Sequence, residues 1–363
     1  MKLTRAGALL ALTLAAVAAA GCSAAAGGDK AGGPAGGPVV LRMASTPSGV
    51  SYAPPVADFV QRVRSLSGGS VQINVISQWG DYAPDAEAQV VRAVAHGTVD
   101  LGWAGSRVFD TMGVPAFGAL SAPMLIDSYP LENAVIKSAV PVRMLAGLSR
   151  LHVTGLAVLG DMLRHPYAVH RPLLAPADWR GLSIGGYRSA AQEQAIRALG
   201  ATPVVAFGPY RTHDLARGAI QGFELDMRTY VHLGLVASAR YVTANVVLWP
   251  QFDVLFANPA RLASLTGQQR AWLQQAAAAS RGSVMLVAGQ NARYIEQACA
   301  LGARFVTATP ADLAALRQAF TPVHRSLETD PQTSGLIAQI QHLKKATPPG
   351  PALAIPAGCA ARQ

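Results

Sequence analysis

The stretch VVLRMASTPSGVSYAPPVADFVQRVRSLSGGSVQINV (residues 39–75) decides the fold class. Its first six residues are an apolar strand candidate, which the Pro and Gly of TPSG (46–49) end. Apolar residues then recur at helical spacing until SGG (67–69), and VQINV (71–75) alternates as a second strand. The order strand, helix, strand is typical of α/β layering with largely parallel strands.

The same alternation continues along the chain. A helix is predicted at 86–95 and a strand at 99–103, and a second α/β unit has predicted strands at 151–159, 182–184 and 202–205 around a helix at 190–199. Residues 245–257 are β-like, and two interrupted helical stretches follow at 260–297 and 310–342. We expect these late helices to lie across both units, before a Pro-rich tail at 346–363.

The N-terminus predicts export. Lys2 and Arg5 precede an apolar run that ends in Ala-Gly-Cys22, which is typical of a signal peptide at 1–21 and resembles the bacterial lipobox. Cys22 is then the lipid attachment residue, and the alternative is an ordinary signal peptide with an unrelated Cys. Residues 22–38 are nearly all Ala, Gly, Ser and Pro, so we expect a flexible tether and an exported, lipid-anchored protein on the periplasmic or extracellular face of the cell membrane.

The charge balance does not indicate nucleic-acid binding. The formal net charge is +10, yet the basic residues are scattered singly and no Lys/Arg run exceeds Lys344-Lys345. A nucleic-acid site needs clustered positive charge, and an exported chain rarely meets nucleic acid.

Two cysteines remain once Cys22 carries a lipid. In an oxidising compartment Cys299 and Cys359 form an even pair, so we predict a disulfide that ties the tail to the body, with two unpaired thiols as the alternative.

Catalytic motifs are not legible. His165 and His170 lack the His-Glu-x-x-His pattern of zinc hydrolases, no Gly-x-Ser-x-Gly turn is complete, and no Walker loop or dinucleotide fingerprint occurs. We therefore predict no cofactor, no metal site and no enzyme. An exported hydrolase would require His165 or His213 to lie beside a buried Ser and an acid.

Several blocks in order resemble the DctP-like family, the solute-binding proteins of TRAP transporters. The most specific is ADWRGLSI (177–184), similar to the family's Asp-Leu-Lys-Gly-Leu-Lys-Ile. The others are residues 59–75, 92–101, 115–127, 198–203 and 215–224. The resemblance implies a type II-like periplasmic-binding-protein fold, with two α/β lobes, hinge strands and a long lobe-spanning helix that close on a ligand.

The resemblance also implies a domain division. Lobe I is expected at 39–160, completed by roughly 248–290, and lobe II at 161–247, with helices at 291–345 packing across the lobes.

Family ligands are usually organic acids, held by an Arg that follows the Gly-Leu-Lys-Ile block, because a guanidinium grips a carboxylate through two hydrogen bonds. Here that position is Gly185. Arg164, in a segment similar to the family's Gly-Phe-Arg-His, and Arg188 are the candidate replacements. The alternative for each is an ordinary salt bridge or a solvated surface position.

Aromatic and polar residues near strand ends complete the candidate site. The aromatic residues could stack on a ring-bearing ligand, although each could equally be a packed core residue. Glu224 matches the family's Gly-x-Glu and is expected near the site or hinge. The full set of aromatic and polar candidates is Tyr52, Trp79, Trp103, Ser106, Tyr187, Glu224, Trp249 and Phe252.

The resemblance thus implies a solute-binding protein that captures a small organic solute, an organic acid or other small carboxylate or aromatic compound, between its lobes and delivers it to TRAP-type permease subunits. The alternative is a sensor-side protein with the same fold. Adjacent genes for small and large membrane subunits would favour transport, and an adjacent histidine kinase would favour sensing.

Overall fold

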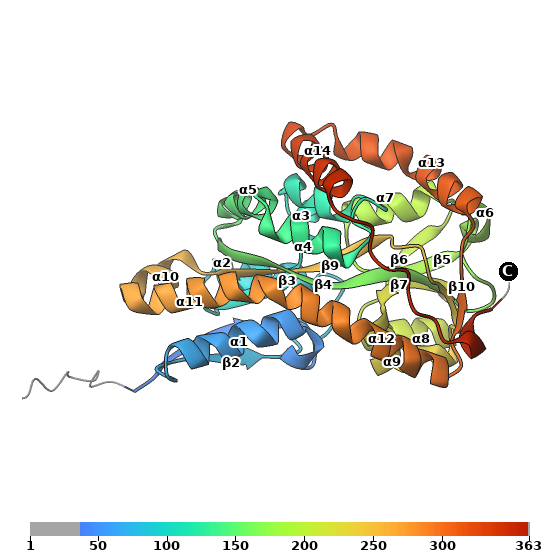
Figure 1. Ribbon diagram of the computed structural model, residues 1–363. Coiled ribbons are helices and arrows are strands. Elements are labelled where there is room, and N and C mark those ends of the chain that lie inside the picture. Colours follow the sequence, from blue (N-terminus) through green and yellow to red (C-terminus); the bar gives the residue numbers. More distant parts are fainter. Residues whose placement is uncertain (1–36, 362–363) are drawn as a thin grey trace, which may run out of the picture. The chain divides into compact units, whose positions relative to one another are not determined.

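The computed structural model describes residues 37–361, and Figure 1 shows their strands and helices. The predicted signal peptide, Cys22 and nearly all of the tether lie outside the described residues. Ten strands form one sheet: β1 Val39–Ala44, β2 Val71–Ile76, β3 Leu101–Gly105, β4 Thr154–Ala168, β5 Ser183–Gly186, β6 Thr202–Val205, β7 Gly222–Asp226, β8 Tyr241–Thr243, β9 Trp249–Ala257 and β10 Arg304–Val306.

Fourteen α-helices cover this sheet within the described residues. They are α1 Pro54–Leu66, α2 Ala86–Ala95, α3 Val108–Thr111, α4 Tyr129–Lys137, α5 Val140–Ala146, α6 Pro176–Trp179, α7 Ala190–Ala198, α8 Pro209–Ala216, α9 Met227–His232, α10 Pro259–Ser264, α11 Gly267–Ser280, α12 Val284–Ala300, α13 Pro310–Leu327 and α14 Pro331–Ala346. No helix in this part of the chain combines the length and the apolar character that crossing a membrane requires.

Two parallel α/β units are joined through antiparallel strands. The main path of the sheet is β2-β1-β3-β9-β4-β7-β5-β6, in which β1, β2 and β3 are parallel and β5, β6 and β7 are parallel. The long strand β4 pairs with β9 from Thr154 to Arg164 and with β7 from Arg164 to Ala168. It therefore belongs to both halves of the sheet.

The apolar core has four clusters, because each half of the sheet is covered on both faces. Along β9, Phe252, Val254 and Phe256 pack into one cluster, with α2 and α4, whereas the alternate residues Leu255 and Ala257 pack into another, with α1 and α11. This alternation follows from the period of two in a strand. In the other half, α9 and α12 cover one face and α7 and α13 cover the other.

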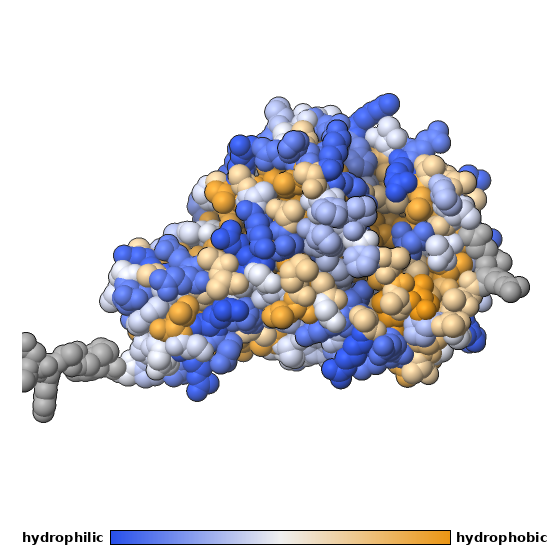
Figure 2. All heavy atoms as spheres, viewed as in Figure 1, coloured by the Kyte–Doolittle hydropathy of each residue, from blue (hydrophilic) through white to orange (hydrophobic). Residues whose placement is uncertain are grey.

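The C-terminal segment connects regions that are distant in the sequence. Helix α14 packs against α4 and α5, and the following tail, red in Figure 1, runs toward β10. There Ala360 bridges to Phe305, and Cys299 and Cys359 form a disulfide, the pairing expected from the sequence. Figure 2 shows apolar residues gathered beside this tail and mostly hydrophilic residues over α13 and α14.

The expected elements are present with changed limits. Strand β4 extends nine residues beyond the expected end at 159, whereas the long helical stretches are divided into α10, α11 and α12 and into α13 and α14. The predicted limit between the lobes at 160/161 falls inside β4, where the pairing with β9 shifts register between Gly160 and Leu163. The lobe limits stay a prediction.

Candidate functional site

A cavity of about 370 Å³ lies between the two α/β units. Most of its lining follows the carboxyl ends of parallel strands: Thr46 and Ser48 after β1, Gln78 and Tyr82 after β2, Arg107 after β3, Tyr187 after β5, Phe207 and Arg211 after β6, and Arg228 after β7. Ligands in open α/β sheets bind at this edge. The cross-strands β4 and β9 supply the floor, with Asp161, Arg164, Gln251 and Asp253.

Three guanidinium groups surround the ring of Tyr187. The guanidinium carbons of Arg107, Arg164 and Arg211 lie 4.0, 4.4 and 5.1 Å from the ring centroid. The negative face of an aromatic ring attracts cations at such distances. Tyr187 therefore organises a positively charged side of the cavity.

Arg107 is neutralised by a glutamate. Its Nη2 donates to both carboxylate oxygens of Glu87 at 2.8 Å, and its Nη1 donates to Gln251 at 2.9 Å. The guanidinium also packs directly against Gly105, where a Cβ would overlap it. A glycine at the end of β3 thus leaves the space that this ion pair occupies.

Arg164 is neutralised in the same way. Its Nε lies 3.0 Å from Oε2 of Glu224, and both side chains are 1% exposed. The same oxygen accepts a hydrogen bond of 3.0 Å from Nε1 of Trp249. Burial is the largest single effect and opposes the charge of Arg164, but Glu224, Tyr187 and Asp226 together outweigh it and hold the arginine pKa above its ordinary value. Glu224 therefore fixes Arg164 at the cavity edge and neutralises its charge.

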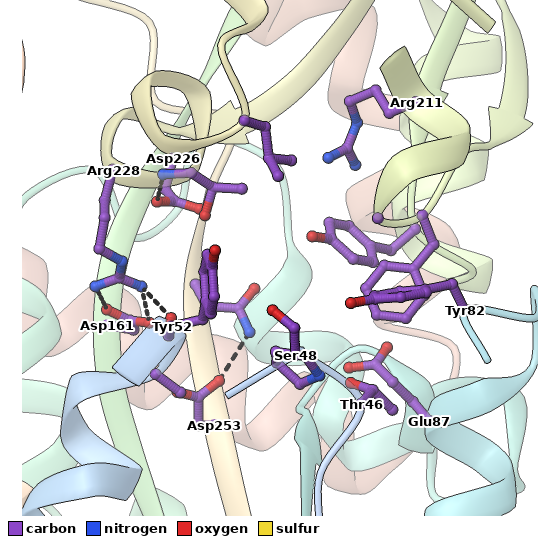
Figure 3. Close-up of a pocket in the computed structure, with 18 of the residues that line it drawn as sticks. Thr46, Ser48, Tyr52, Tyr82, Glu87, Asp161, Arg211, Asp226, Arg228 and Asp253 are labelled. Carbon is purple, nitrogen blue, oxygen red and sulfur yellow. Dashed lines mark hydrogen bonds and ion pairs between the residues drawn. The ribbon is translucent and has the colours of Figure 1, made fainter. Parts of the chain in front are cut away.

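Arg211 is different because its guanidinium, although it lies over aromatic rings, has no hydrogen-bond partner among the described residues. Its side chain is 0% exposed, and none of its three nitrogens makes a hydrogen bond within the described residues. Figure 3 shows the guanidinium pointing toward the cavity. A buried cation without a counter-ion is costly, so this site is incomplete without an anion.

Gly185 faces the core beside Ile220, Ala206 and Phe223. A Cβ there would lie 2.7 Å from Cδ1 of Ile220 and 3.4 Å from Cβ of Phe223, so this position has little room for a larger side chain. The Arg211 guanidinium lies 5.8 Å from the Phe223 ring. Phe223 is therefore a shared neighbour of Gly185, where the family resemblance implied an arginine, and of Arg211, which α8 supplies.

Acidic groups gather on the opposite side of the cavity (Figure 3). Arg228 donates to both oxygens of Asp161, at 2.9 and 2.7 Å, and to the carbonyl of Tyr52. Asp161 lies in the register shift of β4, and such irregularities re-aim side chains near sites. Asp226 caps α9 through the amide of Thr229, and Oδ1 of Asp253 accepts a hydrogen bond from Gln251.

These carboxyl groups differ in protonation. Burial and the neighbouring Asp161 carboxylate raise the pKa of Asp253 to about 8. Burial also raises the pKa of Asp161, although Arg228 opposes the rise. For Asp226 the same burial effect is outweighed by Arg228 and Arg164, which hold its pKa below the ordinary value. Burial and Asp161 therefore favour the neutral form of Asp253, whereas Arg228 and Arg164 favour the charged form of Asp226.

Direct contacts join the two α/β units across the cavity. The rings of Tyr82 and Phe207 meet edge to face with centroids 5.6 Å apart. Asp110 accepts hydrogen bonds from the Ser189 hydroxyl at 2.8 Å and from the first amides of α7. Each contact links one unit to the other, so the structure shows the units drawn together around the cavity.

Four residues predicted for the site line the cavity: Tyr52, Trp103, Arg164 and Tyr187. Trp103 is held by a hydrogen bond of 3.1 Å from its indole nitrogen to the Ser45 hydroxyl. Tyr52 is 36% exposed and lies at the edge.

The other predicted site residues lie away from the cavity lining. Phe252 and Trp249 are fully buried core residues, because alternate β9 side chains point into the helical layers, and Trp79 packs against the same core as Phe252. Ser106 is buried, with its amide bonded to the Phe252 carbonyl. Glu224 acts through Arg164, as described above. Arg188 is exposed and lines a separate hollow.

The residues required for a hydrolase are not brought together. His165 is buried with Nδ1 2.9 Å from the Val246 carbonyl, and His213 lies at the surface near Asp214. Among the described residues no group of three His, Cys, Asp or Glu side chains could hold a metal ion.

Sequence reasoning missed the charged residues that carry most of the site: Glu87, Arg107, Asp161, Arg211, Asp226, Arg228 and Asp253. A signal was present for some of them. Arg107 and Arg228 each follow the carboxyl end of a parallel strand by two residues, the place where α/β sheets bind ligands. Arg211 lies inside a helix, and Asp253 lies in an apolar strand, so neither is distinguished by its neighbours.

Comparisons with known proteins agree with this arrangement. The family described as bacterial extracellular solute-binding protein, family 7 (DctP) matches residues 45–330. No curated protein matches the chain.

Among solved structures, similar folds are found in TRAP periplasmic solute-binding proteins. One from Ralstonia eutropha H16, with bound (S)-2-acetolactate, is 19% identical, with a TM-score of 0.75 over 85% of this chain and 99% of that one. One from Xanthobacter autotrophicus Py2, with bound β-D-galacturonate, is 20% identical, with a TM-score of 0.73 over 83% and 99%. One from Polaromonas sp. JS666, bound to D-erythronate, is 18% identical, with a TM-score of 0.74 over 84% and 98%. The fold, the cavity between two α/β units and the family match lead to one conclusion: the chain belongs to the DctP family of bacterial extracellular solute-binding proteins.

Proposed function

We propose that this protein captures a small carboxylate in the cavity between its two α/β units and delivers it to the membrane subunits of a TRAP-type transporter. A lipid on Cys22 would hold it beside those subunits. The observation that carries the ligand assignment is Arg211, a fully buried cation that lines the cavity and has no partner in the described part of the chain. The carboxylates in the similar solved structures support the same ligand class.

The positions of the cavity residues account for capture of a ligand by closure of the two α/β units. Arg211 and Tyr187 come from one α/β unit and Tyr82 and Arg107 from the other, so a ligand between them contacts both. Closure removes water from the charged groups and strengthens their attraction to a carboxylate. The apolar faces of Tyr82 and Phe207 would cover the remainder of a small ligand.

The test is a thermal-shift screen of residues 39–363 against small carboxylates, including acetolactate, galacturonate and erythronate, followed by calorimetry. A ligand that binds only the folded state at a hundred times its Kd adds about 2.7 kcal/mol of stability. We expect Arg211→Gln to weaken the best carboxylate by at least about thirtyfold, since truncating one member of a buried charge pair costs 2 kcal/mol or more.

The control is Arg188→Gln, which removes an exposed arginine outside the cavity and should leave affinity unchanged. If Arg211→Gln bound the carboxylate as tightly as the wild-type protein, the proposed role of Arg211 in holding the carboxylate would be contradicted. Failure of all carboxylates to shift the melting temperature would contradict carboxylate capture itself.

A further inference from the structure

The charges of the cavity also carry information about the second end of the ligand. This inference rests on the proposed function and deepens it: we propose that the ligand is a zwitterion, with its carboxylate at Arg211 and a protonated nitrogen at the carboxylates of Asp253 and Asp226.

On the positive side of the cavity, one of the three arginines has no acidic residue paired with it among the described residues. Three guanidinium groups surround Tyr187, but Glu87 binds Arg107 and Glu224 binds Arg164, each at 3.0 Å or less. Of these three arginines, Arg211 is the one without a carboxylate partner in the part of the chain that the structure describes. This side therefore binds one anionic group, and a second carboxylate there would meet arginines that are already neutralised.

On the opposite side, acids exceed bases. Arg228 is the cation of this side, and it is held bidentately by Asp161. Asp226 and Asp253 also line the cavity there. Even without Asp253, the two carboxyl groups of Asp161 and Asp226 outnumber the one guanidinium of Arg228.

Asp253 offers an unused oxygen to the cavity. Its side chain is 0% exposed, its Oδ1 accepts from Gln251, and its Oδ2 has no hydrogen-bond partner within the described residues. A buried carboxyl oxygen without a partner is costly, and an ammonium or iminium N–H donor would satisfy it. It would also balance the excess of acid, which an anion alone would not.

The two unpaired groups lie on opposite sides of one cavity, as Figure 3 shows for Arg211 and Asp253. A ligand that contacts both Arg211 and Asp253 must carry its two charged groups at separated positions, with the rest of the molecule between them. The walls of the cavity are lined by Tyr52, Tyr82 and Phe207, so the part of the ligand between its charged groups contacts aromatic rings and not charged side chains.

The test compares matched acids that differ only in the nitrogen. Residues 39–363 are titrated by calorimetry with 2-, 4- and 5-amino acids and with the hydroxy acids of the same carbon skeleton. We expect at least one amino acid to bind ten times or more tightly than its hydroxy partner. Because Asp253 would give up its proton to accept the ammonium, binding at pH 7 should release protons, seen as an enthalpy that changes with the ionisation enthalpy of the buffer.

Asp253→Asn keeps the shape of the side chain but cannot become a carboxylate when the ammonium binds, and it should reduce amino-acid affinity by about thirtyfold while sparing hydroxy acids. Asp81→Asn, at an exposed position outside the cavity lining, is the matched control. The wild-type comparison remains decisive if Asp253→Asn does not fold.

Hydroxy acids that bind as tightly as their amino partners would overturn the zwitterion, and so would the absence of binding by every pair. Either result leaves the proposed function to be judged separately, by the broad carboxylate screen and Arg211→Gln.

Discussion

The ion pair of Arg164 and Glu224 gives a direct test of how the site is held together. Glu224→Gln keeps the shape of the side chain and a carbonyl oxygen that can accept from Trp249, but it leaves Arg164 without its counter-ion. Both side chains are 1% exposed and the Nε–Oε2 distance is 3.0 Å. Breaking one side of such a buried pair costs about 3 to 5 kcal/mol.

The expected result is a large loss of stability. At about 2 °C per kcal/mol for a chain of this size, the melting temperature should fall by about 6 to 10 °C. The assay is thermal unfolding followed by circular dichroism without ligand, with urea unfolding as a second measure of the free energy.

The matched control is Glu193→Gln on α7. Glu193 pairs with Arg197 one helical turn away at 2.9 Å, but the two side chains are 26% and 60% exposed. Exposed pairs of this kind contribute about 0.3 to 0.5 kcal/mol, so the melting temperature should change by about 1 °C or less. If Glu224→Gln and Glu193→Gln had equal effects, the reasoning about the buried pair would be refuted.

Further predictions concern other parts of the chain. Cys299→Ser with Cys359→Ser should lower the free energy of unfolding by about 4 kcal/mol, because the disulfide closes a loop of 60 residues, and unchanged urea unfolding would contradict it. Burial lowers the pKa of His165 from 6.5, its value in the unfolded chain, to about 4. The neutral histidine therefore contributes fully to the free energy of unfolding above pH 6.5, and this contribution is lost as the pH falls to 4. The free energy of unfolding should drop by about 3 kcal/mol over this range, and His165→Gln should remove the drop. Cys22→Ala should move the protein from the membrane fraction to the soluble fraction and abolish labelling with palmitate, whereas retention at the membrane would exclude the lipid anchor.

The local pattern of the sequence was sufficient to predict the two α/β units. Strands such as β1 and helices such as α1 are specified by their own apolar spacing and by the Pro and Gly residues that end them. The extent of β4 could not be predicted in this way. Its second half, which includes Asp161 and Arg164, is fixed by pairing with β7 and β9, which are distant in the sequence.

The same distinction applies to the site. Arg164 was predicted because its segment resembles the family, and Tyr187 because it is an aromatic residue near a strand end. Asp253, in contrast, lies in a strand of mainly apolar residues that gives no local indication of a cavity. Its role depends on the bulge in β4 beside it and on Gln251, which binds one of its two oxygens. Such roles are properties of the packed arrangement, so a single sequence contains them only implicitly.

Gly185 and Arg211 show why the loss of an arginine from a family motif is weak evidence that carboxylate binding is lost. At Gly185 a larger side chain would meet Ile220, and the Arg211 guanidinium, supplied by the next helix along the chain, lies close to the neighbouring Phe223. A carboxylate responds to the position and orientation of the guanidinium and not to the residue number that provides it. Because Arg211 enters from α8 and not from the end of β5, a carboxylate held by it would be approached from a different direction. In the arrangement that we propose, the remainder of the ligand would extend toward Asp226 and Asp253, which line the same cavity. A change in the origin of one arginine is therefore sufficient to alter which end of a small acid the opposite wall must recognise.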